Sequence, residues 1–402
     1  MQRHVALDKK FLRGGVYPLP DPCYNGGKIL GGDSMRAAQL TLDGYFNYGN
    51  ILQKFALHHT LKKFADYTEV LWTDEIKFLP ETGEVAGLPF VMQKERADCW
   101  RMYFIREGAR QSRFKDFENL HLQTRFDIPY IEELADEYDY FVVGSDQVWN
   151  PTWFPPHTFL EFAPREKRIA YAASIVAPEI PAHLKEVFRR GISGFDHLSV
   201  REEGAIKIIR DLTGQTPLLM PDPVLLLTED EWLAVAQPPT WLKSKYARGY
   251  VLTYYLRKSP PPEVKAHADK LNLPVINLLD LNNYNHFTIG PSEFIWLFAH
   301  ASLVFTNSYH GVAFSILFKR PFLNREIEND SVGVNMSMRI PSLLKLFGLE
   351  DRTASDGNRK LDTILDVDFT RREEVLPVER TKAFKFLSEA LGVKNILGDN
   401  LT

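Results

Sequence analysis

The stretch Leu303–Pro321 contains residue types that could bind an anion and move a proton. A short apolar run, Leu303–Thr306, is followed by a polar turn, Asn307–Gly311, and by a second apolar run, Val312–Phe318. This pattern predicts a buried strand, a turn and the start of a helix. Free backbone N–H groups at a helix start attract anions, and open α/β sheets hold ligands at the carboxyl ends of their strands. The sequence therefore predicts an anion site at this junction.

His310 is the candidate for proton chemistry in this turn, with Ser308 before it and Gly311 after it. An imidazole in this position can donate to a phosphate oxygen or deliver a proton near neutral pH. The alternative is an ordinary strand-to-helix connection in which His310 packs or meets solvent. The position between a strand end and a helix start favours the functional interpretation. Lys319 and Arg320 follow two helical turns later and reach the same anion only if the chain folds back.

Two arginines could contribute further positive charge to this site. Arg201 ends a predicted strand in the segment L-S-V-R-E-E. Its planar guanidinium could clamp a carboxylate or phosphate through two parallel hydrogen bonds, a geometry that lysine lacks. The alternative, equally supported, is a solvated charge cluster in which Arg201 pairs with Glu202 or Glu203. Arg339 precedes a predicted helix and is either a second cation of the site or a surface residue, with the surface slightly favoured.

The segment V-V-G-S-D-Q-V-W-N-P follows another predicted strand and is rich in hydrogen-bonding residues. Asp146, Gln147 and Asn150 could bind the hydroxyls of a sugar, and Trp149 could stack on its ring. The alternative is an Asx-type turn with Trp149 in the core. The sequence supports both interpretations equally.

A polar segment after the first predicted strand contains Asn47, Gly49 and Asn50. Gly49 would let a ligand approach the backbone, and Asn50 is a good helix N-cap. A lone glycine is weak evidence, because the G-x-G-x-x-G fingerprint of dinucleotide-binding folds does not occur in this chain.

Two series of alternating strands and helices position these residues, and such alternation predicts parallel sheets. We therefore predict an α/β protein with two Rossmann-like doubly wound domains facing a cleft. The N-terminal domain covers 36–222, a linker covers 223–244, and the C-terminal domain covers 245–402 and ends in a terminal helix. Residues 1–35 are rich in glycine and proline and predict an irregular arm.

Three of the predicted helices concern the arrangement of the domains. The first predicted helix, 51–65, follows the first strand. A long helix at 93–120 is predicted as an insertion beside the first sheet. The terminal helix is predicted at 377–391.

Composition excludes several classes of protein. The chain has 402 residues, 45% hydrophobic residues and a net charge of −4, so it can bury substantial cores and has no overall attraction to nucleic acid or anionic lipid. The apolar runs are too short to span a bilayer and the first residues lack a secretory signal, so we expect no transmembrane segment and a cytoplasmic location. Cys23 and Cys99 have no metal-ligand spacing, and we expect neither a metal site nor a bound cofactor.

Several motifs, taken together and in order, resemble the polysaccharide pyruvyl transferase family. They are N-Y-G-N-I-L-Q at 47–53, V-G-S-D-Q-V-W-N-P at 143–151, A-Y-A-A-S at 170–174, S-V-R-E at 199–202, P-D-P-V at 221–224, F-T-N-S-Y-H-G at 305–311 and M-R-I-P-S-L-L-K-L-F-G-L-E-D-R at 338–352. The resemblance implies a fold similar to the two-Rossmann glycosyltransferase-B type, a phosphoenolpyruvate donor and a ketal product on two sugar hydroxyls. The arm at 1–35 departs from the family pattern.

The implied chemistry assigns a role to each candidate residue. Phosphoenolpyruvate carries a phosphate and a carboxylate, so its site needs several cations or N–H donors. His310 is expected to protonate the methylene carbon or to steady the departing phosphate, and Asp146 is the candidate base for the sugar hydroxyl. The C-terminal domain is the expected donor side and the N-terminal domain the expected acceptor side. The expected donor-binding residues are Arg201, Ser308, Gly311, Lys319, Arg320 and Arg339, and the expected acceptor-binding residues are Asn47, Asn50, Gln147, Trp149 and Asn150.

Two other functions stay open. A nucleotide-sugar glycosyltransferase would use the same two-domain arrangement, with Glu326 or Glu328 as a ribose-binding carboxylate. A non-catalytic sugar-binding relative would keep the fold without the reaction. In each case we expect a sugar or oligosaccharide ligand, free or lipid-linked, and no nucleic-acid partner. The sequence is compatible with a homo-oligomer.

Overall fold

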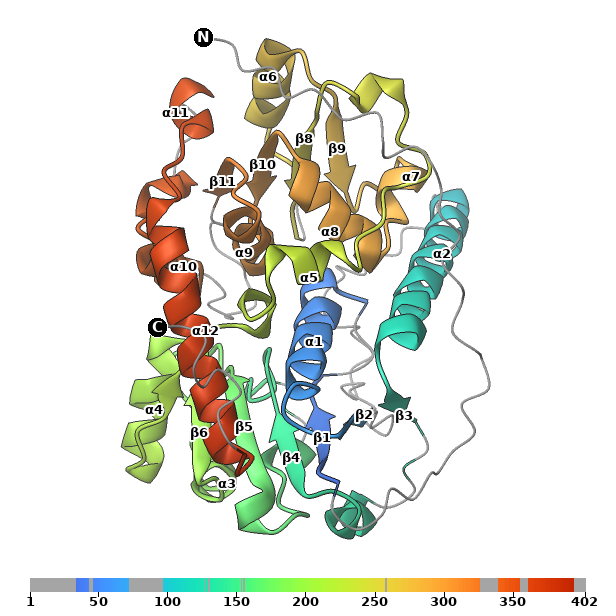
Figure 1. The fold of residues 1–402 in the computed structure, drawn as a ribbon. Helices are drawn as coiled ribbons and strands as arrows, with labels where there is room; N and C mark the ends of the chain where they lie inside the picture. Colours follow the sequence, from blue (N-terminus) through green and yellow to red (C-terminus); the bar gives the residue numbers. More distant parts are fainter. Residues whose placement is uncertain are drawn as a thin grey trace. The chain divides into compact units, whose positions relative to one another are not determined.

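A computed structural model describes residues 34–42, 46–71, 97–126, 128, 131–152, 154, 156–256, 259–325, 339–354 and 361–393. The predicted arm, apart from Ser34 and Met35, lies outside these residues, and so do Glu326 and Glu328. From Met35 onward the described residues belong to one compact unit. This unit contains two parallel sheets (Figure 1).

The first sheet has seven strands in the order β3-β2-β1-β4-β5-β6-β7. The strands are β1 (Arg36–Leu40), β2 (Tyr67–Leu71), β3 (Thr124–Arg125), β4 (Tyr140–Val143), β5 (Arg168–Ala173), β6 (His197–Val200) and β7 (Leu218–Leu219). Strand β1 pairs in parallel with β2 on one side and with β4 on the other, so the chain changes direction across the sheet at this point. Ligands of doubly wound sheets bind beside such a switch point, outside the carboxyl ends of the strands.

The second sheet has five strands in the order β12-β11-β10-β8-β9. The strands are β8 (Val251–Tyr254), β9 (Val275–Leu278), β10 (Leu303–Thr306), β11 (Phe322–Arg325) and β12 (Thr353–Ala354). Its switch point lies between β8 and β10, which is the flavodoxin-like arrangement. The prediction of two Rossmann-like sheets of the glycosyltransferase-B type is confirmed.

Helices connect the strands of both sheets (Figure 1). They are α1 (Tyr48–Leu61), α2 (Ala97–His121), α3 (Lys185–Ser193), α4 (Glu203–Thr213), α5 (Glu229–Leu233), α6 (Pro262–Leu271), α7 (Tyr284–Phe287), α8 (Pro291–His300), α9 (Tyr309–Leu317), α10 (Arg339–Phe347), α11 (Leu361–Leu365) and α12 (Thr370–Ala390). The connections between parallel strands make the βαβ units that the alternating sequence pattern predicts.

Helix α1 is buried on nearly all sides, with His59 as its one residue that is not buried. A helix that is covered all round lies inside the protein rather than on its surface. The Tyr48 ring stacks on Phe294 of α8 at 4.5 Å, and the Tyr48 hydroxyl donates to the carbonyl of Ile289 at 2.7 Å. Helix α1 therefore joins the core of the first sheet to the helices of the second.

Helix α2 was predicted as an insertion beside the first sheet, and it also contacts helices of the second sheet. The Arg113 guanidinium pairs with Glu293 of α8, and the Arg110 guanidinium donates to the carbonyl of Phe46, just before α1. A buried ion pair between Lys54 of α1 and Glu118 of α2 measures 3.3 Å. These contacts connect α2 to α1, to the residue just before α1 and to α8.

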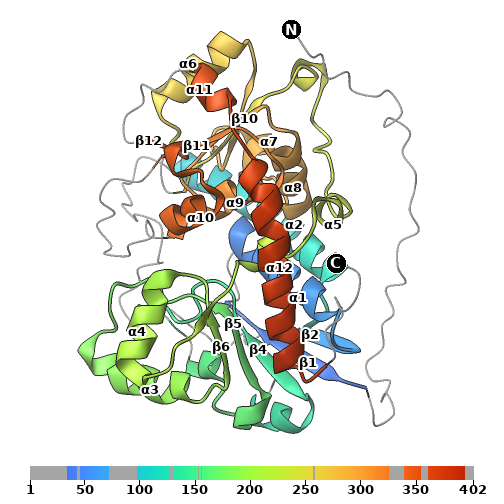
Figure 2. The same cartoon turned by 60° about the vertical axis from the view of Figure 1, so that its left-hand side comes forward.

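Helix α12 is the long red helix in Figure 2. It begins at Thr370, two turns before the predicted start, and it contains Pro377 in its interior. The turns before the proline are held by tertiary contacts, because Arg372 donates to the carbonyl of Leu317 at 2.5 Å and pairs with Glu229. The Phe386 ring near the other end contacts Tyr171 of β5, in the first sheet. The prediction of a helix start at Pro377 was wrong, because contacts with these distant residues stabilise the two helical turns that precede the proline.

In the described part of the chain, no helix combines the length and the apolar character that crossing a bilayer requires. The domain boundaries at 222 and 245 stay a prediction, since the described residues from Met35 onward form one unit.

Candidate active site

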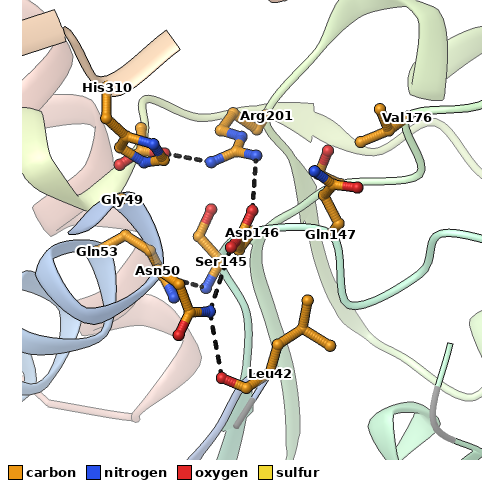
Figure 3. A network of polar contacts seen from close by, with 12 residues as sticks. Leu42, Gly49, Asn50, Gln53, Ser145, Asp146, Gln147, Val176, Arg201 and His310 are labelled. Carbon is orange, nitrogen blue, oxygen red and sulfur yellow. Dashed lines mark hydrogen bonds and ion pairs between the residues drawn. The ribbon is translucent and has the colours of Figure 1, made fainter. Parts of the chain in front are cut away.

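Segments that follow the carboxyl ends of strands in both sheets contribute the residues of one buried polar cluster (Figure 3). His310 is the second residue of α9, directly after β10, and its side chain is 9% exposed. Its Nε2 atom lies 3.5 Å from Oδ2 of Asp222, which follows β7 of the first sheet. The other edge of the ring faces Gly49 in the first turn of α1. His310 therefore lies between elements of both sheets.

Asp222 is fully buried and holds two partners through the same carboxylate oxygen. Its Oδ2 atom pairs with Nη1 of Arg201 and faces His310, while its Oδ1 atom accepts from the backbone N–H of Val224 at 3.0 Å. Burial alone would raise the pKa of the Asp222 carboxyl, but Arg201 and then His310 hold it well below its usual range. Asp222 is therefore a carboxylate that fixes two cationic or titratable neighbours.

Asp146 occupies the loop after β4 and has a left-handed backbone conformation, with φ of 62°. Asn50 of α1 donates to its Oδ2 atom at 3.2 Å, and Nη2 of Arg201 lies 3.5 Å from its Oδ1 atom. The loop is held from the same helix, because the backbone N–H of Ser145 donates to the Gln53 side chain at 3.0 Å (Figure 3). Asp146 is thereby brought close to the Arg201 guanidinium.

The polar residues of the N-Y-G-N-I-L-Q segment serve α1 and the cluster together. Asn47, rather than Asn50, is the N-cap of α1: its side chain accepts from the N–H groups of Gly49 at 2.8 Å and of Asn50 at 3.3 Å. The prediction of Asn50 as the cap was wrong because its side chain bonds instead to Asp146 and to the carbonyl of Leu42. Gly49 leaves room for the His310 ring.

Arg201 and Arg339 both lie over the ring of Tyr309, at 5.1 and 5.7 Å from its centroid. Both side chains are buried, so the surface interpretation of Arg339 was wrong. Burial, together with repulsion from Arg201, lowers the pKa of Arg339. Burial of Arg201 disfavours its charged form and would lower its pKa. The carboxylates of Asp222 and Asp146 outweigh burial and hold the pKa above its ordinary value. Two buried guanidinium groups thus share one aromatic ring.

Glu202 does not form the ion pair with Arg201 that the sequence offered as an alternative. Its Oε1 atom accepts from the Ser174 hydroxyl at 3.0 Å and from the backbone N–H groups of Ile175 and Val176, at 2.8 and 3.3 Å. Arg201 pairs instead with Asp222. Glu202 therefore fixes the loop after β5.

Ser308 and Gly311 shape the turn that carries His310. The hydroxyl of Thr306, the last residue of β10, donates to the carbonyl of Tyr254 at 2.7 Å and accepts from the backbone N–H of Ser308 at 3.0 Å. A Cβ atom at position 311 would lie 2.3 Å from this hydroxyl. Glycine at 311 therefore makes room for Thr306.

Trp149 and Asn150 belong to the structure of their own loop. Trp149 is fully buried, its ring contacts Phe159 and Phe195, and its Nε1 atom donates to a backbone carbonyl. The prediction that it stacks on a sugar was wrong, because no face of the ring is exposed. Asn150 is also buried, donates to the Gln147 side chain at 2.9 Å and accepts from the backbone N–H of Thr152, as in an Asx turn.

Lys319 and Arg320 lie at the opposite end of α9 from His310. Lys319 is 46% exposed and pairs with Glu373 at 3.2 Å and with Glu229 at 3.9 Å. The chain does not fold back toward His310, and these two cations are not brought to the cluster.

Three contributors to the cluster were not identified from the sequence as site residues: Asp222, Tyr309 and Gln53. Asp222 lies between two prolines and caps the short turn Pro223–Leu225. Its position in a rigid loop directly after a strand of the first sheet was the signal that could have found it.

The fold and the cluster define a class: a protein with two Rossmann-like sheets whose strand-end segments share a buried group of histidine, arginine and aspartate side chains. The model of the polysaccharide pyruvyl transferase family matches residues 47–327. The chain belongs to this family of transferases.

No curated protein sequence matches this chain. Solved structures that align with it include UDP-GlcNAc 2-epimerase from Neisseria meningitidis bound to UDP-GlcNAc, at 11% identity over 89% of this chain and 99% of that chain, with a TM-score of 0.42. A second is Anabaena Alr3699/HepE in complex with UDP, at 10% identity over 88% of this chain and 100% of that chain, with a TM-score of 0.44.

Proposed function

We propose that this protein transfers a pyruvyl group from phosphoenolpyruvate to two hydroxyls of a sugar, forming a ketal and releasing phosphate. The acceptor sugar would belong to a polysaccharide or to its precursor. Membership of the pyruvyl transferase family supports this class of reaction.

The observation that carries the donor assignment is a set of buried donor atoms that lack a hydrogen-bond partner. Among the described residues, Nε and Nη2 of Arg201 and Nε2 of His310 have none. Buried donors without partners are costly, so a ligand that supplies acceptor oxygens would be favoured here. Nε and Nη2 form one edge of the guanidinium, and this edge suits a carboxylate or phosphate, although Nη2 also lies 3.5 Å from Oδ1 of Asp146.

Repulsion between Arg201 and Arg339 supports the same assignment. Two buried guanidinium groups over the Tyr309 ring repel one another, and an anion placed beside them would relieve that repulsion. Phosphoenolpyruvate carries two anionic groups, one for each arginine. Lys319 and Arg320 are not included in the proposed donor site, since they lie at the far end of α9.

The proposed reaction begins with a proton that His310 delivers to the methylene carbon of the donor, which makes C2 electrophilic. Asp146 accepts the proton of the first sugar hydroxyl as its oxygen bonds to C2. The bond between C2 and the phosphate oxygen then breaks, and the phosphate leaves with the bonding electron pair and takes up the proton held by Asp146. The second hydroxyl adds to C2 to close the ketal and gives its proton to His310, which restores the imidazolium. Asn50 and Gln147 would hold the acceptor beside Asp146.

The test measures donor binding and turnover separately. Phosphoenolpyruvate should raise the melting temperature of the purified protein, and phosphate release should depend on both the donor and a sugar, supplied as a panel of nitrophenyl hexosides. His310→Ala should retain donor-induced stabilisation and lose phosphate release. Stabilisation by UDP- or GDP-sugars but not by phosphoenolpyruvate would overturn the proposal in favour of a nucleotide-sugar glycosyltransferase.

A further inference from the structure

The imidazole of His310 lies against the backbone of Gly49. A Cβ atom at position 49 would come within 2.0 Å of Nδ1, 2.5 Å of Cε1 and 2.6 Å of Cγ of the His310 ring. Carbon atoms do not approach a ring so closely, so any larger residue at 49 must displace the imidazole or the helix. The ring atoms nearest to Gly49 are on the Nδ1 edge.

The opposite edge of the same ring faces Asp222. The Nε2 atom lies 3.5 Å from the Asp222 carboxylate, and the ring of Tyr309 packs edge-on against the imidazole with 5.2 Å between centroids. Gly49 and Asp222 therefore confine His310 from two sides.

Both confining groups are themselves held firmly. Gly49 is fixed by the Asn47 side chain, which accepts its N–H at 2.8 Å. Asp222 is fixed by the ion pair with Arg201 and by the N–H of Val224. A ring confined between two fixed groups keeps one orientation toward the rest of the cluster.

The conformation of α1 does not explain a glycine at position 49. Gly49 lies inside the helix and has no left-handed backbone angle, so other residues could adopt its conformation. Glycine also weakens a helix relative to alanine. Its contact with His310 therefore accounts for its presence. Gly108 of α2 provides a comparison, because a Cβ atom there would meet nothing within 4 Å.

We infer that Gly49 and Asp222 are positioning residues that hold His310 in its working orientation, one from the first turn of α1 and one from the loop after β7. The inference rests on the proposed function for the role of His310 in turnover, but the placement of the ring can be tested without it.

The first experiment compares Gly49→Ala with the matched control Gly108→Ala, in the full chain. The rate of acylation of His310 by diethyl pyrocarbonate is measured by peptide mass spectrometry, with the more exposed His59 as internal reference. We expect faster labelling of His310 in Gly49→Ala, because the displaced ring leaves its confined position, and no change in Gly108→Ala. Unchanged labelling of a folded Gly49→Ala protein overturns the inference.

The second experiment uses turnover with phosphoenolpyruvate. Gly49→Ala should lower kcat about 100-fold with donor KM changed little, since a displacement of about 1 Å can cost that much in rate. Gly108→Ala should match the wild type. Wild-type kcat in Gly49→Ala would overturn the inference while leaving the proposed function intact. Absence of turnover in the wild type would overturn the proposed function, and labelling would still decide the placement of His310.

Asp222→Asn provides a second variant in case Gly49→Ala does not fold. Removal of the carboxylate that faces Nε2 should also change the labelling rate of His310, whereas Asp196→Asn, which removes a surface partner of Arg165, should not. Equal labelling in both variants contradicts the role of Asp222.

Discussion

The two ends of helix α9 carry titratable or charged side chains in opposite surroundings. At its first turn, His310 is buried against Gly49 and faces Asp222. Just after its last turn, Lys319 is 46% exposed and pairs with glutamates of α5 and α12. The helix has nine residues and is therefore about 13 Å long, so the two ends cannot serve one small ligand.

The difference shows that a position just after the carboxyl end of a strand, rather than proximity in sequence, decides which charges form the cluster, since Asp146, Arg201 and His310 follow β4, β6 and β10. The start of α9 directly follows β10, where the strand order of the second sheet reverses. The end of α9 lies one helix length away from that point and is held by α12. We therefore expect substitutions at the first end to change catalysis and stability, and substitutions at the second end to change little.

The largest effect should come from His310→Ala. General acid catalysis contributes roughly 10²- to 10⁴-fold, so turnover with phosphoenolpyruvate should fall by that factor while the circular dichroism spectrum is unchanged. Steady-state phosphate release measures the effect. Wild-type turnover in a well-folded His310→Ala enzyme would show that the first turn of α9 is no more important for catalysis than its last turn.

Asp222→Asn should have the largest effect on stability. The substitution leaves Arg201 buried without its main partner, which typically costs about 3–5 kcal/mol in the free energy of unfolding. Urea denaturation measures it, with Glu373→Gln at the far end of α9 as control. A loss of less than about 1 kcal/mol for Asp222→Asn would contradict the role of this carboxylate in the cluster.

Arg201→Lys should mainly weaken donor binding. One ammonium group cannot present the two parallel donors of a guanidinium, so we expect the KM for phosphoenolpyruvate to rise about tenfold with a smaller change in kcat. Initial-rate kinetics over a donor concentration series separate the two constants. Unchanged KM and kcat would exclude Arg201 from the proposed donor site.

His58 tests whether burial alone gives a histidine a role in catalysis. It is buried in α1, has no hydrogen-bond partner among the described residues, and burial lowers its pKa to about 3. The unfolded chain takes up a proton below about pH 6.5 and the folded protein does not, so stability should fall as pH drops from 6.5 toward 3, by up to about 1.4 kcal/mol per pH unit.

His58→Leu should reduce this slope and leave turnover unchanged. Urea midpoints measured at pH 7 and pH 5 give the slope, and phosphate release at neutral pH gives the turnover. The same pH dependence in variant and wild type would show that His58 is not the group that titrates.

The smallest effect should come from Lys319→Ala. Exposed ion pairs contribute about 0–1 kcal/mol, so the free energy of unfolding should change by no more than that and the KM for phosphoenolpyruvate should stay within about twofold. A large increase in KM would show that the far end of α9 takes part in donor binding after all.

Much of the fold was predictable from the sequence because its signals are local. The run at Leu303–Thr306 matches the observed strand, and the alternation of such runs with helical patterns predicts parallel sheets. The polar loops at strand ends were predicted for the same reason, and they supply His310, Asp146 and Arg201 to the cluster.

Local signals were insufficient wherever a distant partner decides the outcome. Pro377 predicts a helix start, but contacts of Arg372 with Leu317 and Glu229 extend the helix beyond it. The sequence supported a sugar contact and a core position for Trp149 equally, and only its packing against Phe159 and Phe195 decides for the core. In each case the contacting residues are separated in the sequence, and tertiary packing rather than sequence spacing brings them together.

The sequence alone determined the two series of βαβ units, the family and the loops that carry the reactive side chains, because periodicity and turn residues act over a few positions. Only the tertiary structure decided that His310 lies between Gly49 and Asp222, and that Arg201 pairs with Asp222 rather than with its neighbour Glu202. The contacts of His310 join the two sheets, and the pair of Arg201 and Asp222 joins two strands of the first. All of these residues are far apart in the sequence and meet only when the strands have assembled.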